Sequence, residues 1–331
     1  MIVRTVYDAD HEALRDSVRR FLAEQAVPHR QRWDGAGIDP EFWTAVHKYG
    51  FLGLSAEDPR FAAVVLEEAM AAGLPAVALM LAGHESFAPL TGRAVSGLLA
   101  VVDAGSMRAE QSDDRWVLTG AADSVINGNS AGLLLVVATD GASDMVFAVD
   151  PAAAGVHRSP ADALLGLDAA DVADLRFDAT PGDLIDADLA AGRAGHHLLL
   201  AVAAMAGART ALAMTVEYVK QRKAFGRPIA EFENTQHVLA GVGAQVTAVG
   251  AFVDNCLAEG ASLRPAEAAA AKCCAADVLA LAVDAGVQLH GGYGYMWEYP
   301  IARAYAAARF FRLHGDAGEH LNSTLANAIG L

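Results

Sequence analysis

Apolar residues recur at helical spacing along the first part of the chain. Near the N-terminus they fall at Leu14, Val18, Phe21 and Leu22. This spacing of three to four residues places them on one helical face, and Pro28 follows at a point where a helix would end. The pattern predicts an amphipathic helix that buries one side.

The next helices are marked by prolines at their first positions. Asp39 and Pro40 provide an N-cap residue and an N1 proline for a second helix. Apolar runs that begin at Pro59 and Pro75 predict a third and a fourth helix. We therefore expect residues 1–95 to form an N-terminal helical domain.

The pattern changes in residues 96–185, where short runs rich in Val, Ile and Leu are separated by Gly, Asp, Asn and Ser. This is typical of strands and turns. No helical pattern of 10–15 residues lies between the runs, which favours an antiparallel sheet or small barrel over βαβ units. The runs read GLLAVVD, RWVLTGAADSVIN, GLLLVVAT, DMVFAVD and VADLRFDAT.

Residues 186–331 return to helical spacing. The segment that begins DADLAAGRAG is Ala-rich and apolar around much of its circumference, which predicts a helix inside a bundle rather than on its surface. Two more long helices follow, a fourth is expected after Pro300, and the tail GEHLNSTLANAIG predicts a fifth. The predicted fold is α+β and mainly α: an N-terminal helical domain, a small antiparallel β-module, and a C-terminal four-helix bundle.

Composition excludes several classes of function. Of 331 residues, 54% are hydrophobic and 19% charged, so a disordered chain is excluded. The net charge of −16 repels nucleic acid. Arg209 interrupts the most apolar stretch, which argues against a membrane span, and the N-terminus lacks a secretory pattern. The odd set Cys256, Cys273 and Cys274 predicts reduced thiols in a cytoplasmic protein, with no disulfide framework and no metal site.

Two motifs in the third part carry chemistry suited to a nucleotide. In KQRKAFG, Arg222 can form a fork of hydrogen bonds with phosphate oxygens, and Phe225 can pack beside an adenine or anchor the turn. In GVQLHGGYG, Gly291 and Gly292 lack Cβ atoms, so the backbone can approach a nucleotide closely. Each motif alone also fits a solvated charge or a helix C-cap.

Taken together, the order of the three parts and these motifs resemble the acyl-CoA dehydrogenase family along essentially the whole chain. The resemblance implies FAD as cofactor, with the ADP half held across a subunit interface and the flavin ring in the neighbouring subunit. One departure is Glu233, where the family often has a Gln suited to the pyrophosphate. The residues implied to bind the ADP half are Arg222, Phe225, Gln288, Gly291 and Gly292, with Gln236 as a further candidate.

The family's elements for holding the flavin ring are reduced. Its Thr-Glu-Pro-x-x-Gly-Ser-Asp loop survives only as Asp103, Gly105 and Ser106. A second element, usually aromatic-Ile-Thr-Asn, is represented by Ser124–Asn127, in which only the end is preserved. The chain is therefore predicted to hold the isoalloxazine ring poorly.

The family's catalytic carboxylate is also absent at both of its usual positions. This Glu removes the α-proton of the acyl group, which requires a carboxylate within hydrogen-bond reach. Most members carry it in the connection between the last helices, where this chain has His314 and Gly315. Other members carry it on the long first helix of the bundle, where this chain has His196 beside His197. The histidines are interpreted as packing or interface residues.

Two nearby carboxylates are alternative bases. Asp316 is one position displaced from the usual site, which shortens its reach, and Glu319 matches a second, non-catalytic Glu of the family pattern. Asp316 is the stronger of the two. No catalytic residue is therefore assigned, and Asp316 is kept as a candidate.

These features predict that the chain supplies half of a site: it binds the ADP half of a shared FAD and depends on a partner subunit for the catalytic base. The chain resembles the short subunit of actinobacterial heterotetrameric acyl-CoA dehydrogenases that act on steroid side-chain CoA esters. That resemblance implies an α2β2 complex with a full-length subunit, an acyl-CoA substrate and an electron-transfer flavoprotein as acceptor. Two alternatives remain: a self-sufficient homo-oligomeric dehydrogenase using Asp316, and a non-enzymatic scaffold or CoA-binding subunit.

Overall fold

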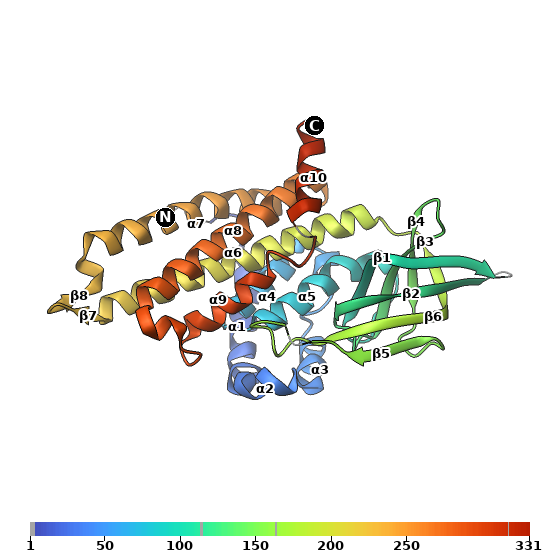
Figure 1. The fold of residues 1–331 in the computed structure, drawn as a ribbon, viewed down its shortest axis with the longest axis horizontal. Helices are drawn as coiled ribbons and strands as arrows, with labels where there is room; N and C mark the ends of the chain where they lie inside the picture. The colour runs from blue at the N-terminus through green and yellow to red at the C-terminus, as the bar shows by residue number, and fades with distance from the viewer. Residues whose placement is uncertain (1–3, 113–114, 163, 317) are drawn as a thin grey trace.

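The computed structural model describes residues 4–112, 115–162, 164–316 and 318–331, without the side chains of residues 318–320. The three predicted parts follow one another in the predicted order. Figure 1 shows the N-terminal helices beneath the C-terminal helices, with the sheet at one end of the long axis. The predicted order of an N-terminal helical part, a small β-module and a C-terminal helical bundle is confirmed.

The N-terminal part contains the four predicted helices and one that the sequence reading missed. Its helices are α1 Ala9–Gln25, α2 Arg30–Ala36, α3 Pro40–Lys48, α4 Pro59–Ala71 and α5 Pro75–Phe87, with 3-10 turns at Val27–His29, Leu54–Ala56 and Ala88–Thr91. The missed helix is α2, whose short, polar sequence has no apolar period and which kinks at Asp34 and Gly35. Asp39 precedes α3 as predicted, but its carboxylate accepts the Trp33 Nε1–H at 2.8 Å instead of capping the helix.

An ion-pair cluster ties this part to the bundle. The buried Glu67 of α4 lies 2.8 Å from Arg4, 3.0 Å from Arg15 and 3.5 Å from Arg209 of the third part. Burial alone would raise the pKa of Glu67, but Arg4 and Arg209 hold that pKa below its usual value. Because a buried carboxylate without partners is costly, each of these arginines fixes α4 against its neighbours.

The middle part is a small barrel. Its strands are β1 Leu99–Ser112, β2 Arg115–Ile126, β3 Leu133–Thr139, β4 Asp144–Val149, β5 Val156–Pro160 and β6 Val172–Ile185. They pair in the order β2-β1-β3-β4-β6-β5, and β2 also pairs with β6, which closes the ring. The prediction of a purely antiparallel module is wrong in one place, because β1 and β3 pair in parallel. The short, exposed β5 was not predicted.

The third part is the helical bundle. Its elements are α6 Leu189–Gln221, the hairpin strands β7 Lys223–Ala224 and β8 Arg227–Pro228, α7 Glu233–Glu259, α8 Pro265–His290, α9 Pro300–Phe310 and α10 Gly318–Ala328, with 3-10 turns at Ile229–Glu231, Gly260–Ser262 and Gly291–Tyr295. The central helix α6 has 33 residues and therefore spans roughly 50 Å. It ends at Gln221, so the Arg-x-x-Phe-Gly motif lies in the hairpin and not on the helix.

Within the described residues, two helices are long and apolar enough to cross a membrane by length and composition alone. In α6, 67% of the apolar window is buried within the protein, as expected for the core helix of a bundle. In α7 only 22% is buried. The exposed side of α7 carries small residues such as Ala244, Ala248 and Ala251, a surface that allows another helix to approach closely.

Candidate functional site

Four of the predicted ADP-binding residues gather at the outer end of the bundle. Arg222, Gln288, Gly291 and Gly292 line an open hollow of about 580 Å³ where α6 ends beside the turn that follows α8. The guanidinium of Arg222 lies 5.5 Å from the centre of the Tyr293 ring. Arginine, an amide side chain and exposed glycine backbone are groups that can bind phosphate and ribose oxygens. The sequence-based grouping of these residues is therefore reproduced in space.

The turn after α8 needs glycine for two separate reasons. Gly291 has φ +60°, a left-handed conformation that ends the helix, and open space surrounds its Cα. A Cβ on Gly294 would overlap the Val287 carbonyl oxygen, because the chain folds back against α8 there. The backbone of the turn is consequently held close to the helix end and exposed on its outer side.

Phe225 and Gln236 do not line this hollow. Phe225 stands at the tip of the β7–β8 hairpin with φ +51° and is 97% exposed. An apolar ring on a strained backbone, without burial in its own chain, is a feature expected of a contact with another molecule. The Gln236 amide instead donates to the Ala230 carbonyl at 3.0 Å, which stabilises the local turn. The departure Glu233 is exposed, 3.8 Å from His237.

A second hollow, here called the flavin-side cavity, lies at the opposite end of α6. Its volume is about 260 Å³, and it is enclosed by α5, β1, the end of β2, the start of α6 and the α9–α10 connection. Asp103, a remnant of the flavin loop, lies in β1 and pairs with Arg193 of α6 at 2.6 Å. The ion pair links the barrel to the bundle at a wall of this cavity.

Asn127, the preserved end of the second flavin element, has a structural role. Its buried amide donates to the carbonyls of Met80 at 3.0 Å and Leu99 at 2.9 Å, so it joins the barrel to α5. Its Oδ1 has no hydrogen-bond partner among the described residues. A buried acceptor in the cavity wall is one group that a bound polar ring can satisfy.

The two usual positions of the base pack against each other. A Cβ on Gly315 would overlap Leu200 Cδ1 and lie 3.1 Å from the His196 ring, so His196 and Leu200 fill the space of a side chain at 315. His196 Nε2 lies 3.3 Å from His314 Nε2, within hydrogen-bond distance. No carboxylate stands at either position.

Burial keeps these histidines neutral. It lowers the pKa of His314 to about 4, with a smaller contribution from the charge of Lys272. It also lowers the pKa of His196 well below its usual value, assisted by His314 and His197. At neutral pH His196 and His314 are therefore both uncharged, and one ring can donate a hydrogen bond to the other.

Asp316 does line the flavin-side cavity, but not on a helix as the sequence reading assumed. It has φ +66° in the connection between α9 and α10. Its carboxylate lies 3.1 Å from His197 Nε2, and its carbonyl accepts a hydrogen bond from Lys272 Nζ at 2.7 Å. The His197–Asp316 contact has the geometry of an acid–base pair. The other candidate, Glu319, has a side chain outside the described residues.

The two clusters fit the two halves of FAD differently. The outer hollow offers a cation, an amide and free backbone, which suit an ADP group. In the flavin-side cavity two buried atoms, Asn127 Oδ1 and His196 Nδ1, have no partner among the described residues, and Asp103 pairs with Arg193. Along the chain Arg222 follows His197 by 25 residues, so the clusters are roughly 38 Å apart by the rise of α6. This distance exceeds the length of one dinucleotide, so one FAD cannot occupy both sites of the same chain.

Arg193 of the flavin-side cavity was missed by the sequence reading, and so was the pairing of His196 with His314. Arg193 pairs with a residue 90 positions away, and His196 with one 118 positions away. Their sequence neighbourhoods contain no motif. Only the adjacent histidines at 196 and 197 were a visible signal, since a polar pair in an apolar helix is unusual.

Comparison with family models shows matches in two of the three parts. Residues 8–92 match the model described as "Acyl-CoA dehydrogenase, N-terminal domain". Residues 187–329 match "Acyl-CoA dehydrogenase, C-terminal domain". The matched ranges contain the N-terminal helices and the whole bundle, including the outer hollow.

Comparison with individual proteins gives the same family. The mitochondrial long-chain specific acyl-CoA dehydrogenase of Sus scrofa is 30% identical over 378 positions, which cover 99% of this chain and 88% of the relative. Because the chain has 331 residues, several tens of those positions have no counterpart in it. A probable acyl-CoA dehydrogenase of Mycobacterium tuberculosis is 27% identical, with 97% of this chain and 95% of the relative covered.

Solved structures show the same fold. An acyl-CoA dehydrogenase from Geobacillus kaustophilus superposes with a TM-score of 0.91 at 25% identity, covering 99% of this chain and 100% of the other. A glutaryl-CoA dehydrogenase from Mycobacterium smegmatis, in complex with FADH2, gives 0.89 at 18% identity, covering 98% and 95%. The second likeness concerns the fold alone.

Proposed function

This chain belongs to the acyl-CoA dehydrogenase family, an FAD-dependent family of oxidoreductases, and from that premise we propose that it is the dependent subunit of a hetero-oligomer. It contributes the ADP-binding half of an FAD site whose flavin-binding half and catalytic base come from a full-length partner. The reaction is the α,β-dehydrogenation of an acyl-CoA thioester.

The single observation that carries the proposal is the contrast between the two hollows. Arg222, Gln288 and the Gly291–Gly292 backbone are assembled on the outside of the bundle, roughly 38 Å along α6 from the cavity of the same chain. In that cavity the positions of the base hold His196 and Gly315, which pack together. The chain thus retains what a neighbour uses and lacks what its own site requires.

FAD, when bound, supplies the hydride acceptor for this reaction. Arg222 would pair with the pyrophosphate as a fixed cation, and Gln288 and the Gly291–Gly292 backbone would orient the ribose and adenine side. None of these groups moves a proton. The removal of the α-proton is assigned to a carboxylate of the partner, because neutral His196 hydrogen-bonds to His314 and Asp103 is paired with Arg193.

The surface around the outer hollow supports assembly with another chain. Two large apolar side chains of the neighbouring loops are almost wholly exposed, Phe225 at 97% and Tyr295 at 92%, and Met296 of the hollow's wall is 47% exposed. The small-residue side of α7 adds a second exposed apolar surface. An α2β2 arrangement would cover both surfaces.

Four finer proposals rest on the resemblance. The acyl group is a steroid side chain, the full-length partner forms the α2β2 complex, and an electron-transfer flavoprotein reoxidises the cofactor. We also place the complex in the cytoplasm, a location supported by the three free cysteines. Turnover of a steroid side-chain CoA ester compared with a long-chain acyl-CoA tests the first of these.

Flavin stoichiometry tests the shared site. Purified alone, the chain should be colourless; co-purified with a full-length homologue that carries both the Thr-Glu-Pro loop and the catalytic Glu, it should give one FAD for every two chains. One FAD per chain in the isolated protein would contradict the proposal.

A self-sufficient dehydrogenase is the second candidate, favoured by the 3.1 Å contact between Asp316 and His197 in the flavin-side cavity. It requires turnover by the isolated chain, lost in Asp316→Asn. The scaffold alternative requires a complex that contains no FAD at all. The same purification distinguishes the three proposals.

A further inference from the structure

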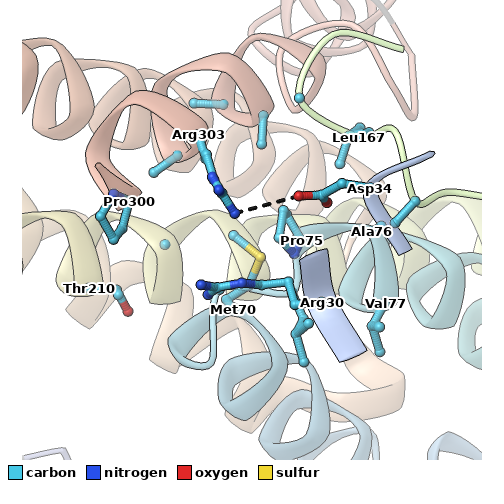
Figure 2. A pocket seen from close by; sticks show the side chains of 18 of the residues that line it. Arg30, Asp34, Met70, Pro75, Ala76, Val77, Leu167, Thr210, Pro300 and Arg303 are labelled. Atoms are coloured by element: carbon cyan, nitrogen blue, oxygen red, sulfur yellow. Dashed lines mark hydrogen bonds and ion pairs between the residues drawn. The ribbon is translucent and has the colours of Figure 1, made fainter. Parts of the chain in front are cut away.

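A third cavity lies where the three parts of the chain meet. It has a volume of about 110 Å³ and is enclosed by α2, the α4–α5 turn, the β5–β6 connection, α6, α8 and α9 (Figure 2). It shares no lining residue with the flavin-side cavity or with the outer hollow. We refer to it as the junction cavity.

Most of the wall of the junction cavity is hydrocarbon. Six large apolar side chains of the wall are buried in the described structure: Trp33, Met70, Leu74, Val77, Leu279 and Phe311. An apolar ligand body gains free energy by entering such a space in proportion to the surface that it removes from water. The cavity by itself would accept a short hydrocarbon group.

One polar group in this wall lacks a partner. The side chain of Arg30 in α2 makes no hydrogen bond or ion pair with any residue that the structure describes, and its Nε is closed off from solvent. Its Nη1 would lie 2.9 Å from a Cβ on Gly73, so the glycine leaves room for the guanidinium beside the α4–α5 turn. A partly buried guanidinium without an acceptor is unfavourable, and an anion would satisfy it.

The second arginine of the cavity is already paired. Arg303 of α9 lies 3.5 Å from Asp34, and its Nε–H donates to the Trp297 carbonyl at 2.9 Å. Figure 2 shows the guanidinium groups of Arg30 and Arg303 both turned towards the Met70 side chain. The exposed Asp168 is also part of the wall, and its negative charge would repel an anion placed next to it. The anion is therefore expected at Arg30.

We propose that the junction cavity binds a short-chain monocarboxylate, with the carboxylate on Arg30 and the hydrocarbon tail among the buried side chains. The volume of about 110 Å³ is below the ~150 Å³ of an engineered cavity that holds benzene, so it encloses only the hydrocarbon tail, roughly five carbons long. A planar carboxylate matches the two parallel N–H donors of a guanidinium. A phosphate fits less well, because the apolar wall cannot satisfy its remaining oxygens.

This site is separate from the proposed shared flavin site. Along α6 its lining begins at Gly207, ~15 Å from His197 of the flavin-side cavity. Leu199, Leu200 and Ala203 are buried between them. Occupancy would join the three parts at their junction, so the ligand is expected to stabilise the folded chain by mass action.

Ligand-observed NMR and calorimetric titration of the full chain with hexanoate test the proposal, with hexan-1-ol as the neutral analogue. Hexanoate should bind and raise the melting temperature, and hexan-1-ol should bind at least tenfold more weakly. Arg30→Gln should weaken hexanoate binding about 10- to 100-fold, the effect of losing a charge-assisted hydrogen bond. Arg20→Gln, which removes an exposed arginine of α1, is the matched control and should bind as the unmodified chain does.

Ala304→Phe offers a test that keeps the charge, because it adds a ring to the cavity wall; it should abolish hexanoate binding. Equal binding of hexanoate and hexan-1-ol, or unchanged binding by Arg30→Gln, would overturn the assignment. So would inorganic phosphate that competes with hexanoate at equal concentration. Displacement of hexanoate by an acyl-CoA would show that the cavity is part of the substrate channel and would overturn the separate site.

Discussion

The two ends of α6 carry two sets of cofactor-type residues, and the sets differ in where their polar groups find partners. At the outer end, Arg222 has an aromatic ring beside it but no carboxylate among the described residues, and Phe225 lies wholly in solvent. At the inner end, Asp103 pairs with Arg193 and His196 contacts His314. The outer set is arranged for a molecule outside the chain, whereas the inner set is largely satisfied within it.

This difference shows that an active site can be lost when other side chains occupy the space of the catalytic residue, as well as when that residue is deleted. The space for a side chain at 315 is not empty; it is occupied by His196 and Leu200. Restoring a carboxylate in sequence therefore does not restore it in space. The predictions below test the two ends, beginning with the largest expected effect.

Gly315→Glu should destabilise the protein by about 2–4 kcal/mol and should not create activity in the isolated chain. The new side chain would overlap Leu200 and contact His196, and φ +65° is unfavourable for a residue with a Cβ. Urea unfolding measures the change. Adding His196→Ala to Gly315→Glu should recover part of the stability; a fully stable, active Gly315→Glu variant would show that the inner cavity is not filled.

Acidification should lower the unfolding free energy of the chain through a buried histidine of the inner end. The pKa of His314 is lowered to about 4 by burial, so the unfolded chain takes up a proton near pH 6.5 and the folded chain does not. Stability from this group is complete above the unfolded pKa and is lost as pH falls from about 6.5 towards 4, by a few kcal/mol.

Denaturant unfolding at pH 7, 6 and 5 checks this dependence in the unmodified chain and in His314→Asn. The variant should show a shallower loss, although His84, whose pKa burial also lowers to about 4, keeps part of the slope. Identical slopes would mean that His314 is not held neutral by its surroundings.

Arg222→Ala should reduce the FAD affinity of the complex about 10- to 100-fold, because a charge-assisted hydrogen bond to phosphate contributes about 1.5–3 kcal/mol. The stability of the isolated chain should stay within about 0.5 kcal/mol, as expected for an exposed position. Lys220→Ala, two residues earlier in the last turn of α6 and also exposed, is the matched control. Unchanged flavin affinity in Arg222→Ala would remove the outer hollow from the FAD site.

Phe225→Ala should leave the stability of the isolated chain unchanged and weaken subunit association about tenfold, the size expected for an aromatic contact residue. Analytical ultracentrifugation of the complex measures this. Phe225→Gly separates the ring from the backbone, since glycine adopts φ +51° without strain. If both variants associate as tightly as the unmodified chain, the hairpin tip lies outside the interface.

The sequence was sufficient for the parts of the molecule that local signals determine. Pro59, Pro75 and Pro300 occupy first helical positions as predicted, and Gly291 and Gly292 lie in the turn that ends α8. The parallel pairing of β1 with β3 and the position of Arg30 depend on contacts between distant segments. The same holds for Asp316, whose left-handed backbone could not be anticipated from a helical count.

Anaerobic spectrophotometry tests the central claim most directly. The isolated chain, supplied with FAD and then with a saturated acyl-CoA, should show no loss of flavin absorbance; the complex with the full-length partner should bleach on the same addition. Bleaching by the isolated chain, abolished by Asp316→Asn, would contradict the account and establish a complete site within one chain.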